Sequence, residues 1–65
     1  MDNEKLAETI LDQIKFIRDT GLTNMFVTGA VKRLAKELEF DELAEYITKN
    51  PSKYCKVIMT GKVEL

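Results

Sequence analysis

The fold is decided by the stretch from Thr28 to Ile47, which reads TGAVKRLAKELEFDELAEYI. Apolar residues in its first half recur at the three- and four-residue intervals of one helix face: Ala30, Val31, Leu34, Ala35 and Leu38. A second series at helical spacing follows directly: Phe40, Leu43 and Ile47. Two short amphipathic helices with almost no linker between them must fold back on each other. The stretch therefore predicts a helical pair whose remaining apolar surface is covered by the rest of the chain.

A long helix is predicted before this pair, from Asp2 or Asn3, either of which can cap it, to Thr20. Gly21 is expected to end it, because glycine tolerates the positive φ of a helix C-terminus. A narrow stripe of isoleucine and leucine forms its core face: Leu6, Ile10, Ile14 and Ile17. Leu11 and Phe16 lie on either side of that stripe, so the apolar surface is wider than two short helices easily cover. We therefore expect that a symmetric homodimer through this helix uses the excess.

Three short helices complete the prediction. Thr28 is expected to cap one that runs to about Glu39, and Asp41 one that runs to about Lys49. Asn50 and Pro51 mark the start of a last helix, which runs to about Thr60, because proline suits the first helical position. The expected core residues of the last two helices are Leu43, Ala44, Ile47, Tyr54, Cys55, Val57 and Ile58. Tyr46 is expected at the border of the core, with its hydroxyl in contact with water. Residues 62–65 are expected to form a short extended tail. The fold class is thus all-α: a compact bundle of four helices in a single domain, residues 1–65.

Four-residue spacing also predicts surface ion pairs on these helices. The pairs are Lys15 with Asp19, Arg33 with Glu37, and Glu45 with Lys49.

Composition removes several classes of function. The chain has 65 residues, no histidine, and Cys55 as its only cysteine. A disulfide within the chain is excluded, a zinc site of the common Cys and His type lacks ligands, and a serine or cysteine nucleophile lacks its usual base. We read Cys55 as a small buried hydrophobic residue and the carboxylates near Asp41 as helix-capping groups. The expectation is a protein that is not an enzyme and holds no metal or cofactor.

The charge balance bears on partners and location. Ten Lys and Arg face eleven Asp and Glu, a net charge of -1, whereas dedicated nucleic-acid binders usually carry a clear basic excess. No apolar run approaches the roughly 18 residues that a membrane span requires. The acidic N-terminus lacks the order of a signal peptide. We therefore expect a cytoplasmic protein with no membrane partner.

The stretch from Leu22 to Val27 has unusual content for a loop, because Met25, Phe26 and Val27 stand beside Thr23 and Asn24. The simpler interpretation is a hydrophobic plug that turns inward, with Asn24 hydrogen-bonding the turn. The functional interpretation is an exposed recognition loop led by Phe26.

A basic cluster of Lys32, Arg33 and Lys36 lies on one side of the second helix. With the helix that follows, it matches the spacing of a helix-turn-helix motif, in which the later helix would read the major groove. That helix presents Glu42 and Glu45 instead, and carboxylates repel phosphates. A solvated basic face, or one that docks an acidic protein surface, is the favoured interpretation, and a small DNA-binding regulator remains the alternative.

Several stretches together resemble a family of uncharacterised proteins of about this length, a domain of unknown function from Firmicutes and their bacteriophages. The specific part is Ile17-Arg-Asp-Thr-Gly21 followed by Thr23-Asn-Met-Phe26, and the pattern continues through Ala30-Val-Lys-Arg-Leu-Ala35 to Thr60-Gly61. Two positions depart from the family pattern: Val27, where an aspartate is expected, and Glu39, where a glycine is expected. They fall at the start of the second helix and in the turn after it.

The resemblance implies a phage or mobile-element gene without an assigned activity. Small non-catalytic phage proteins often bind host machinery, and counter-defence proteins such as anti-CRISPRs are of this kind. We therefore expect stoichiometric binding to a host protein or complex in the host cytoplasm. The expected partner-binding residues are Arg18, Asn24, Phe26, Lys32, Arg33 and Lys36. A structural accessory subunit of a phage assembly is a further alternative.

Overall fold

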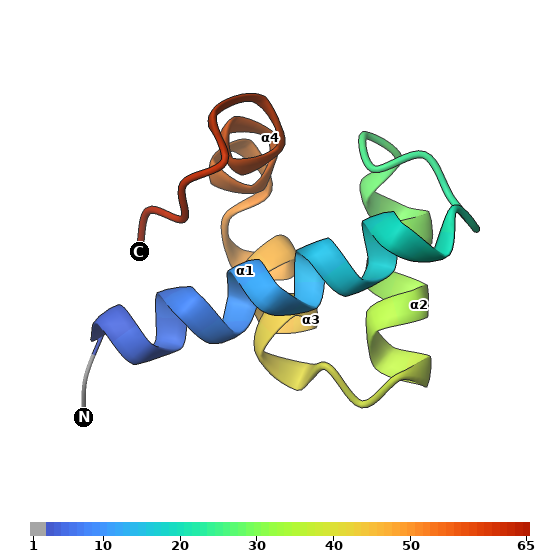
Figure 1. Ribbon diagram of the computed structural model, residues 1–65, viewed down its shortest axis with the longest axis horizontal. Coiled ribbons are helices and arrows are strands. Elements are labelled where there is room, and N and C mark those ends of the chain that lie inside the picture. Colours follow the sequence, from blue (N-terminus) through green and yellow to red (C-terminus); the bar gives the residue numbers. More distant parts are fainter. Residues whose placement is uncertain (1–2) are drawn as a thin grey trace.

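Helical periodicity in the sequence becomes four helices in the computed structural model, which describes residues 3–65 (Figure 1). They are α1 (Asn3–Thr20), α2 (Thr28–Glu37), α3 (Asp41–Lys49) and α4 (Pro51–Thr60). The all-α prediction of one long and three short helices is confirmed, and no strand occurs in these described residues. The predicted cap of α1, Asp2 or the side chain of Asn3, lies outside the described part of the chain.

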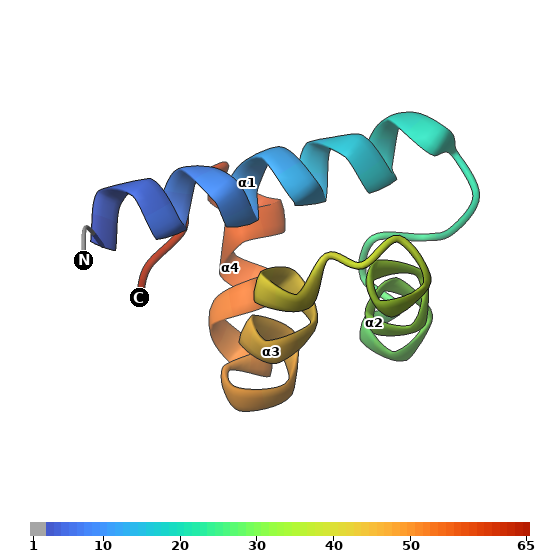
Figure 2. The ribbon, with the colours of Figure 1, turned by 90° about the horizontal axis from the view of Figure 1, so that it is seen from below.

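The third helix, α3, is the centre of the packing. It lies against α1, α2 and α4, and α1 also contacts α2. Figure 2 shows α1 as a rod that runs across the other three helices. The buried core draws on all four helices and on one loop residue: Ile10, Ile14, Ile17, Met25, Val31, Ala35, Leu43, Ala44, Tyr46, Ile47, Tyr54 and Val57. The periodic stripe of α1 and the helical pair therefore pack as their spacing predicts.

Glycine ends two of the helices, as expected. Gly21 follows α1 with φ of 67°, and Gly61 follows α4 with φ of 77°. The Gly61 N–H also donates a 2.7 Å hydrogen bond to the Val57 carbonyl oxygen, which satisfies one of the last carbonyls of α4.

The predicted side-chain caps of α2 and α3 are wrong. Val27, not Thr28, is the N-cap residue of α2, and no side chain caps that end. Phe40, not Asp41, holds the same position in α3, again without a cap from its own side chain. A glutamine of α1 caps the start of α3 instead: Gln13 Oε1 accepts a 3.1 Å hydrogen bond from the Leu43 N–H. In both helices the predicted cap residue is already the first helical residue.

The turn between α2 and α3 is longer than predicted, because it contains Leu38 and Glu39 as well as Phe40. Helix α2 ends at Glu37, two residues before the expected end at Glu39. Glu39 itself has φ of 61°, a left-handed conformation that side chains other than glycine rarely adopt. The Phe40 N–H then donates to the Ala35 carbonyl oxygen at 2.7 Å. The helix ends early because the chain reverses direction at Glu39.

Several side chains of the second half lie differently from the prediction. Tyr46 is buried rather than at the border, and its hydroxyl donates to the Glu64 carbonyl oxygen at 2.6 Å. Cys55 and Ile58 are only half-buried against the core. The tail, residues 62–65, belongs to no helix or strand, and Val63 packs against the core.

One predicted ion pair forms and two do not. Glu45 and Lys49 are 2.7 Å apart. Asp19 lies 3.8 Å from Arg18 rather than pairing with Lys15. Arg33 and Glu37, both within the described residues, form no pair.

Candidate protein-interaction surface

The loop between α1 and α2 exposes three large apolar side chains within six residues. Leu22 is 73% exposed, Phe26 56% and Val27 51%. Met25, between them in sequence, is buried in the core. An apolar cluster in contact with water raises the free energy of the isolated molecule, so clusters of this kind commonly mark surfaces that bind other proteins.

Hydrogen bonds hold this loop in one conformation. The buried Tyr54 hydroxyl of α4 donates to the Met25 carbonyl oxygen at 2.7 Å. Asn24 Oδ1 accepts the Phe26 N–H at 2.9 Å, and the Asn24 carbonyl oxygen accepts the Val27 N–H at 3.0 Å. The Leu22 N–H donates to the Thr20 hydroxyl at 3.2 Å. Each turn of the loop is thus fixed either to its neighbours or to α4.

Each of the two sequence interpretations of this loop describes part of it. Met25 is the hydrophobic plug, and Asn24 hydrogen-bonds the turn as predicted. Phe26 points out of the core, as a recognition loop requires. Adjacent residues therefore divide the two tasks, since Met25 is buried and Phe26 is exposed.

The basic cluster lies on one face of α2, beginning a turn and a half after the loop. Arg33 and Lys36 are exposed, and Lys32 is half-buried. At 1.5 Å per residue, Lys32 is about 7.5 Å along the helix axis from Val27. We call these three cations and the loop side chains Leu22, Phe26 and Val27 together the loop surface.

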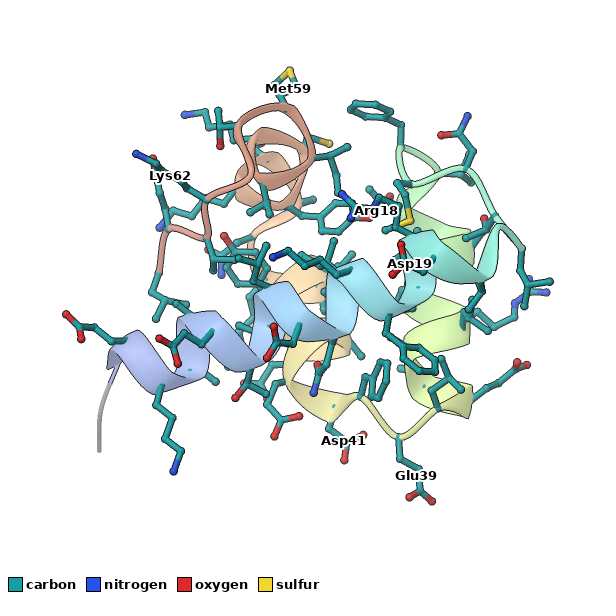
Figure 3. The ribbon with its side chains drawn as sticks, viewed as in Figure 1. Arg18, Asp19, Glu39, Asp41, Met59 and Lys62 are labelled. Atoms are coloured by element: carbon teal, nitrogen blue, oxygen red, sulfur yellow. The ribbon has the colours of Figure 1, made fainter. Side chains whose placement is uncertain are left out.

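Two of the six predicted site residues, Asn24 and Arg18, use their polar groups in contacts within the domain. Asn24 is exposed, but its side-chain oxygen is used within the turn, so it shapes the loop. Arg18 of α1 lies next to Asp19 (Figure 3), with its Nε 3.8 Å from the Asp19 carboxylate oxygen. The other four, Phe26, Lys32, Arg33 and Lys36, follow one another along the loop and α2, with Lys36 next to the last residue of that helix.

Sequence reasoning missed Leu22 and Val27 as surface residues, because a short loop has no periodicity that separates inward from outward side chains. It predicted Phe16 as excess apolar surface of the long helix but missed the cluster that Phe16 forms with the turn after α2. Phe16 of α1 is 52% exposed, and its ring meets that of Phe40 edge to face, with centroids 5.5 Å apart. Leu38, in the same turn as Phe40, is exposed as well. Leu11, by contrast, packs against the core. The excess apolar surface expected on α1 is therefore partly covered within the chain.

A hollow of about 290 Å³ lies between α1, α3 and the last residues, with Leu6, Ile10, Tyr46 and Leu65 among its lining. The Glu45–Lys49 pair stands at this hollow. Among residues 3–65 no cluster of three His, Cys, Asp or Glu side chains could hold a metal ion. Within the same residues, no helix combines the length and apolar character needed to cross a membrane.

The helix that would read DNA in the helix-turn-helix interpretation is the central one. Leu43, Ala44, Tyr46 and Ile47 of α3 are buried against the rest of the molecule. Its exposed charged residues are Asp41, Glu42, Glu45 and Lys49. Glu42 accepts a 3.1 Å hydrogen bond from Gln13, which lowers the pKa of its carboxyl. This face of α3 is therefore anionic at neutral pH.

Comparison with known proteins gives one match. The chain matches no curated protein and no solved structure. A family profile does match, over residues 6–62, which is nearly the whole chain and includes all four helices from Leu6 onward. The resemblance seen in the sequence is confirmed: the chain belongs to the family described as Domain of unknown function (DUF5049).

Proposed function

We propose that this domain is a non-enzymatic protein-binding module that docks its partner through the loop surface, with Phe26 as the anchor. One observation carries the proposal: Phe26 is 56% exposed although the residues on both sides of it are fixed by hydrogen bonds. Fixing the loop before binding lowers the entropy cost of association. An aromatic side chain that is presented in this way has the character of a binding hot spot.

Cations beside an apolar anchor indicate the chemistry of the partner. Lys32, Arg33 and Lys36 form no ion pair within the described residues, so their charge is available to another molecule. Opposite charges across an interface raise the rate of association and fix its orientation. A protein surface that combines an apolar pocket with acidic residues fits the loop surface best.

The resemblance to phage-encoded proteins supplies the proposed setting. There the partner is a host protein or complex in the cytoplasm, and the domain acts by stoichiometric binding, as counter-defence inhibitors of the anti-CRISPR kind do. Service as an accessory subunit of a phage assembly would use the same surface. The DNA-binding alternative gains no support from α3, whose exposed face is anionic.

Capture of partners from a host lysate tests the proposal. Phe26→Ala and the combined reversal Lys32→Glu, Arg33→Glu, Lys36→Glu are expected to lose a partner that the wild-type domain captures. Phe16→Ala is the matched control, because Phe16 is the same residue type at nearly the same exposure, 52%. If both surface variants stay folded and keep the partner, the binding site lies elsewhere.

A second measurement addresses DNA. Binding to duplex DNA would weaken steeply as salt increases, because cations are released from the phosphates. We expect no measurable binding of the domain to duplex DNA at low salt. Tight, salt-sensitive binding would favour the regulator instead.

A further inference from the structure

The charges of this chain are divided at the end of α2. Residues 20–36 contain three cations and no acidic residue, whereas residues 37–48 contain five acidic residues and no cation. The cations are Lys32, Arg33 and Lys36, and the acidic residues are Glu37, Glu39, Asp41, Glu42 and Glu45. The boundary coincides with the last residue of α2. The cations therefore occupy the second half of α2, and the acidic residues begin at its last residue and continue through the turn into α3.

Each side of the boundary also carries an exposed apolar cluster. On the basic side it is the loop cluster of Leu22, Phe26 and Val27. On the acidic side Phe16 stacks edge-on against Phe40, and Leu38 is exposed beside them. Glu39 and Asp41 project outward from the same turn (Figure 3). We call Phe16, Leu38, Phe40, Glu37, Glu39 and Asp41 the turn surface.

The two apolar clusters lie at opposite ends of α2, although Lys36 of the loop surface is followed directly by Glu37 of the turn surface. Helix α2 lies between the two clusters, and its ten residues span about 15 Å. Figure 1 shows α2 running from the loop at one end to the turn that leads into α3 at the other. The two apolar clusters thus cannot cover each other within one molecule, and the charges that follow the loop cluster along the chain are opposite in sign to those of the turn.

We propose that the turn surface binds the loop surface of a second copy of this chain, head to tail. Such a contact joins an apolar cluster with acidic neighbours to one with basic neighbours. A symmetric contact of two turn surfaces would oppose Glu37, Glu39 and Asp41 to their own copies, which charge repulsion disfavours. Head-to-tail contacts leave one free surface of each kind, so they extend into rings or chains. The inference rests on the proposed function in one respect: it takes the loop surface to be a docking face, so self-association and the foreign partner exclude each other.

Charge exchange between two variants of the full chain tests this directly. The first variant, Lys32→Glu with Lys36→Glu, makes the loop surface acidic, and the second, Glu37→Lys with Glu39→Lys, makes the turn surface basic. Lys56→Glu with Lys62→Glu is the matched control, because it makes the same change of charge on exposed residues of α4 and the tail. Sedimentation equilibrium at low and high salt measures association, and circular dichroism verifies the helices. If a double variant loses helicity, the single changes Lys36→Glu and Glu39→Lys replace it.

The wild-type domain is expected to self-associate in a salt-sensitive way. Each charge variant alone should associate more weakly by on the order of tenfold, since both of its surfaces then carry the same sign. An equimolar mixture of the two should regain wild-type association, whereas the control should match the wild type throughout.

Three results would overturn the inference. They are a wild-type monomer at millimolar concentration and low salt, association that neither reversal changes, and a mixture that fails to recover. Association that depends on Phe16 but not on these charges would indicate the symmetric dimer through α1. All of these results are obtained with the purified chain, whereas the proposed function fails if Phe26→Ala and the combined charge reversal both stay folded and keep a captured foreign partner.

Discussion

The hydroxyl of Tyr54 donates a 2.7 Å hydrogen bond to the carbonyl oxygen of Met25, which joins α4 to the loop between α1 and α2. Tyr54 has no exposed surface, and Met25 is buried beside it. The bond lies inside the core, one residue away from the exposed Phe26. The position of the proposed anchor therefore depends on a contact with a helix that is distant in sequence.

Replacing Tyr54 with phenylalanine should destabilise the fold by about 1–2 kcal/mol, because the Met25 carbonyl oxygen is left buried without a donor. It should also speed amide hydrogen exchange at Phe26 and Val27, since the loop loses its link to α4. Urea denaturation and hydrogen exchange measure the two effects. Tyr46→Phe is the control, because it removes a similar bond to the Glu64 carbonyl oxygen. That variant should be destabilised without faster exchange in the loop, and equal exchange in both variants would contradict the role of Tyr54.

The same residue predicts how stability depends on alkaline pH. Burial, with a smaller effect of the neighbouring Cys55, raises the pKa of Tyr54 from 10.0 to about 12. Between these values the unfolded chain has released a proton that the folded chain still holds, so stability falls as pH rises. The decline attributable to Tyr54 should approach about 1.4 kcal/mol per pH unit above pH 10.

Denaturation of the wild type and Tyr54→Phe at a series of pH values measures this decline. The wild-type curve should fall more steeply above pH 10. The pKa of Tyr46 is also raised, mainly by burial, so some decline remains in the variant. Parallel curves would show that Tyr54 does not titrate as described.

Gln13 of α1 caps the start of α3, a role that the sequence assigns to Asp41. Its Oε1 accepts the Leu43 N–H at 3.1 Å, and its Nε2 donates to Glu42 Oε1 at 3.1 Å. Gln13→Ala should therefore cost about 1 kcal/mol of stability, the usual value of a lost helix cap. Asp41→Ala should reduce stability by less, because the Asp41 side chain makes no capping hydrogen bond at the start of α3. Thermal denaturation of the two variants ranks them, and the reverse order would restore Asp41 as the cap.

The Gln13 bond also lowers the pKa of Glu42 below its ordinary value. The folded chain then holds the Glu42 proton less tightly than the unfolded chain, so its contribution is present above the unfolded pKa. It is lost as pH falls through the folded pKa. In Gln13→Ala, NMR titration should show the pKa of Glu42 move upward, and an unchanged value would mean that the hydrogen bond does not form in solution.

The elements that could be predicted from sequence are those that periodicity defines. The stripe of Ile10, Ile14 and Ile17 and the limits of α4 follow from spacing and from proline and glycine alone. The cap of α3 could not be predicted, because Gln13 and Leu43 are 30 residues apart and meet only in the folded chain. Likewise, the cluster at Phe26 could be suspected from composition. Only the fold decides that Met25 turns inward while Phe26 turns outward.

Glu39→Gly should stabilise the protein by about 1 kcal/mol. Glu39 has φ of 61°, where an L side chain is strained by roughly 1–2 kcal/mol and glycine is not. The greater freedom of glycine in the unfolded chain offsets part of this gain. Glu37→Gly is the control, because Glu37 is the last helical residue of α2 and does not have a positive φ, so glycine there should destabilise. The two changes should shift the urea midpoint in opposite directions, and a loss in both would show that Glu39 carries no strain.

Val27→Asp should also stabilise the protein, and in addition should weaken the loop surface. Val27 is the N-cap residue of α2 with φ of -88° and ψ of 87°, and no side chain satisfies the first amides of that helix. An aspartate can accept one of these N–H groups and interact with the positive end of the helix, a gain of about 1 kcal/mol. Val27→Asn separates the hydrogen bond from the charge. Because Val27 is 51% exposed in the loop cluster, the aspartate also places a negative charge beside Phe26. We therefore expect a higher melting temperature with weaker self-association. A variant that is more stable and associates as before would exclude Val27 from the interface.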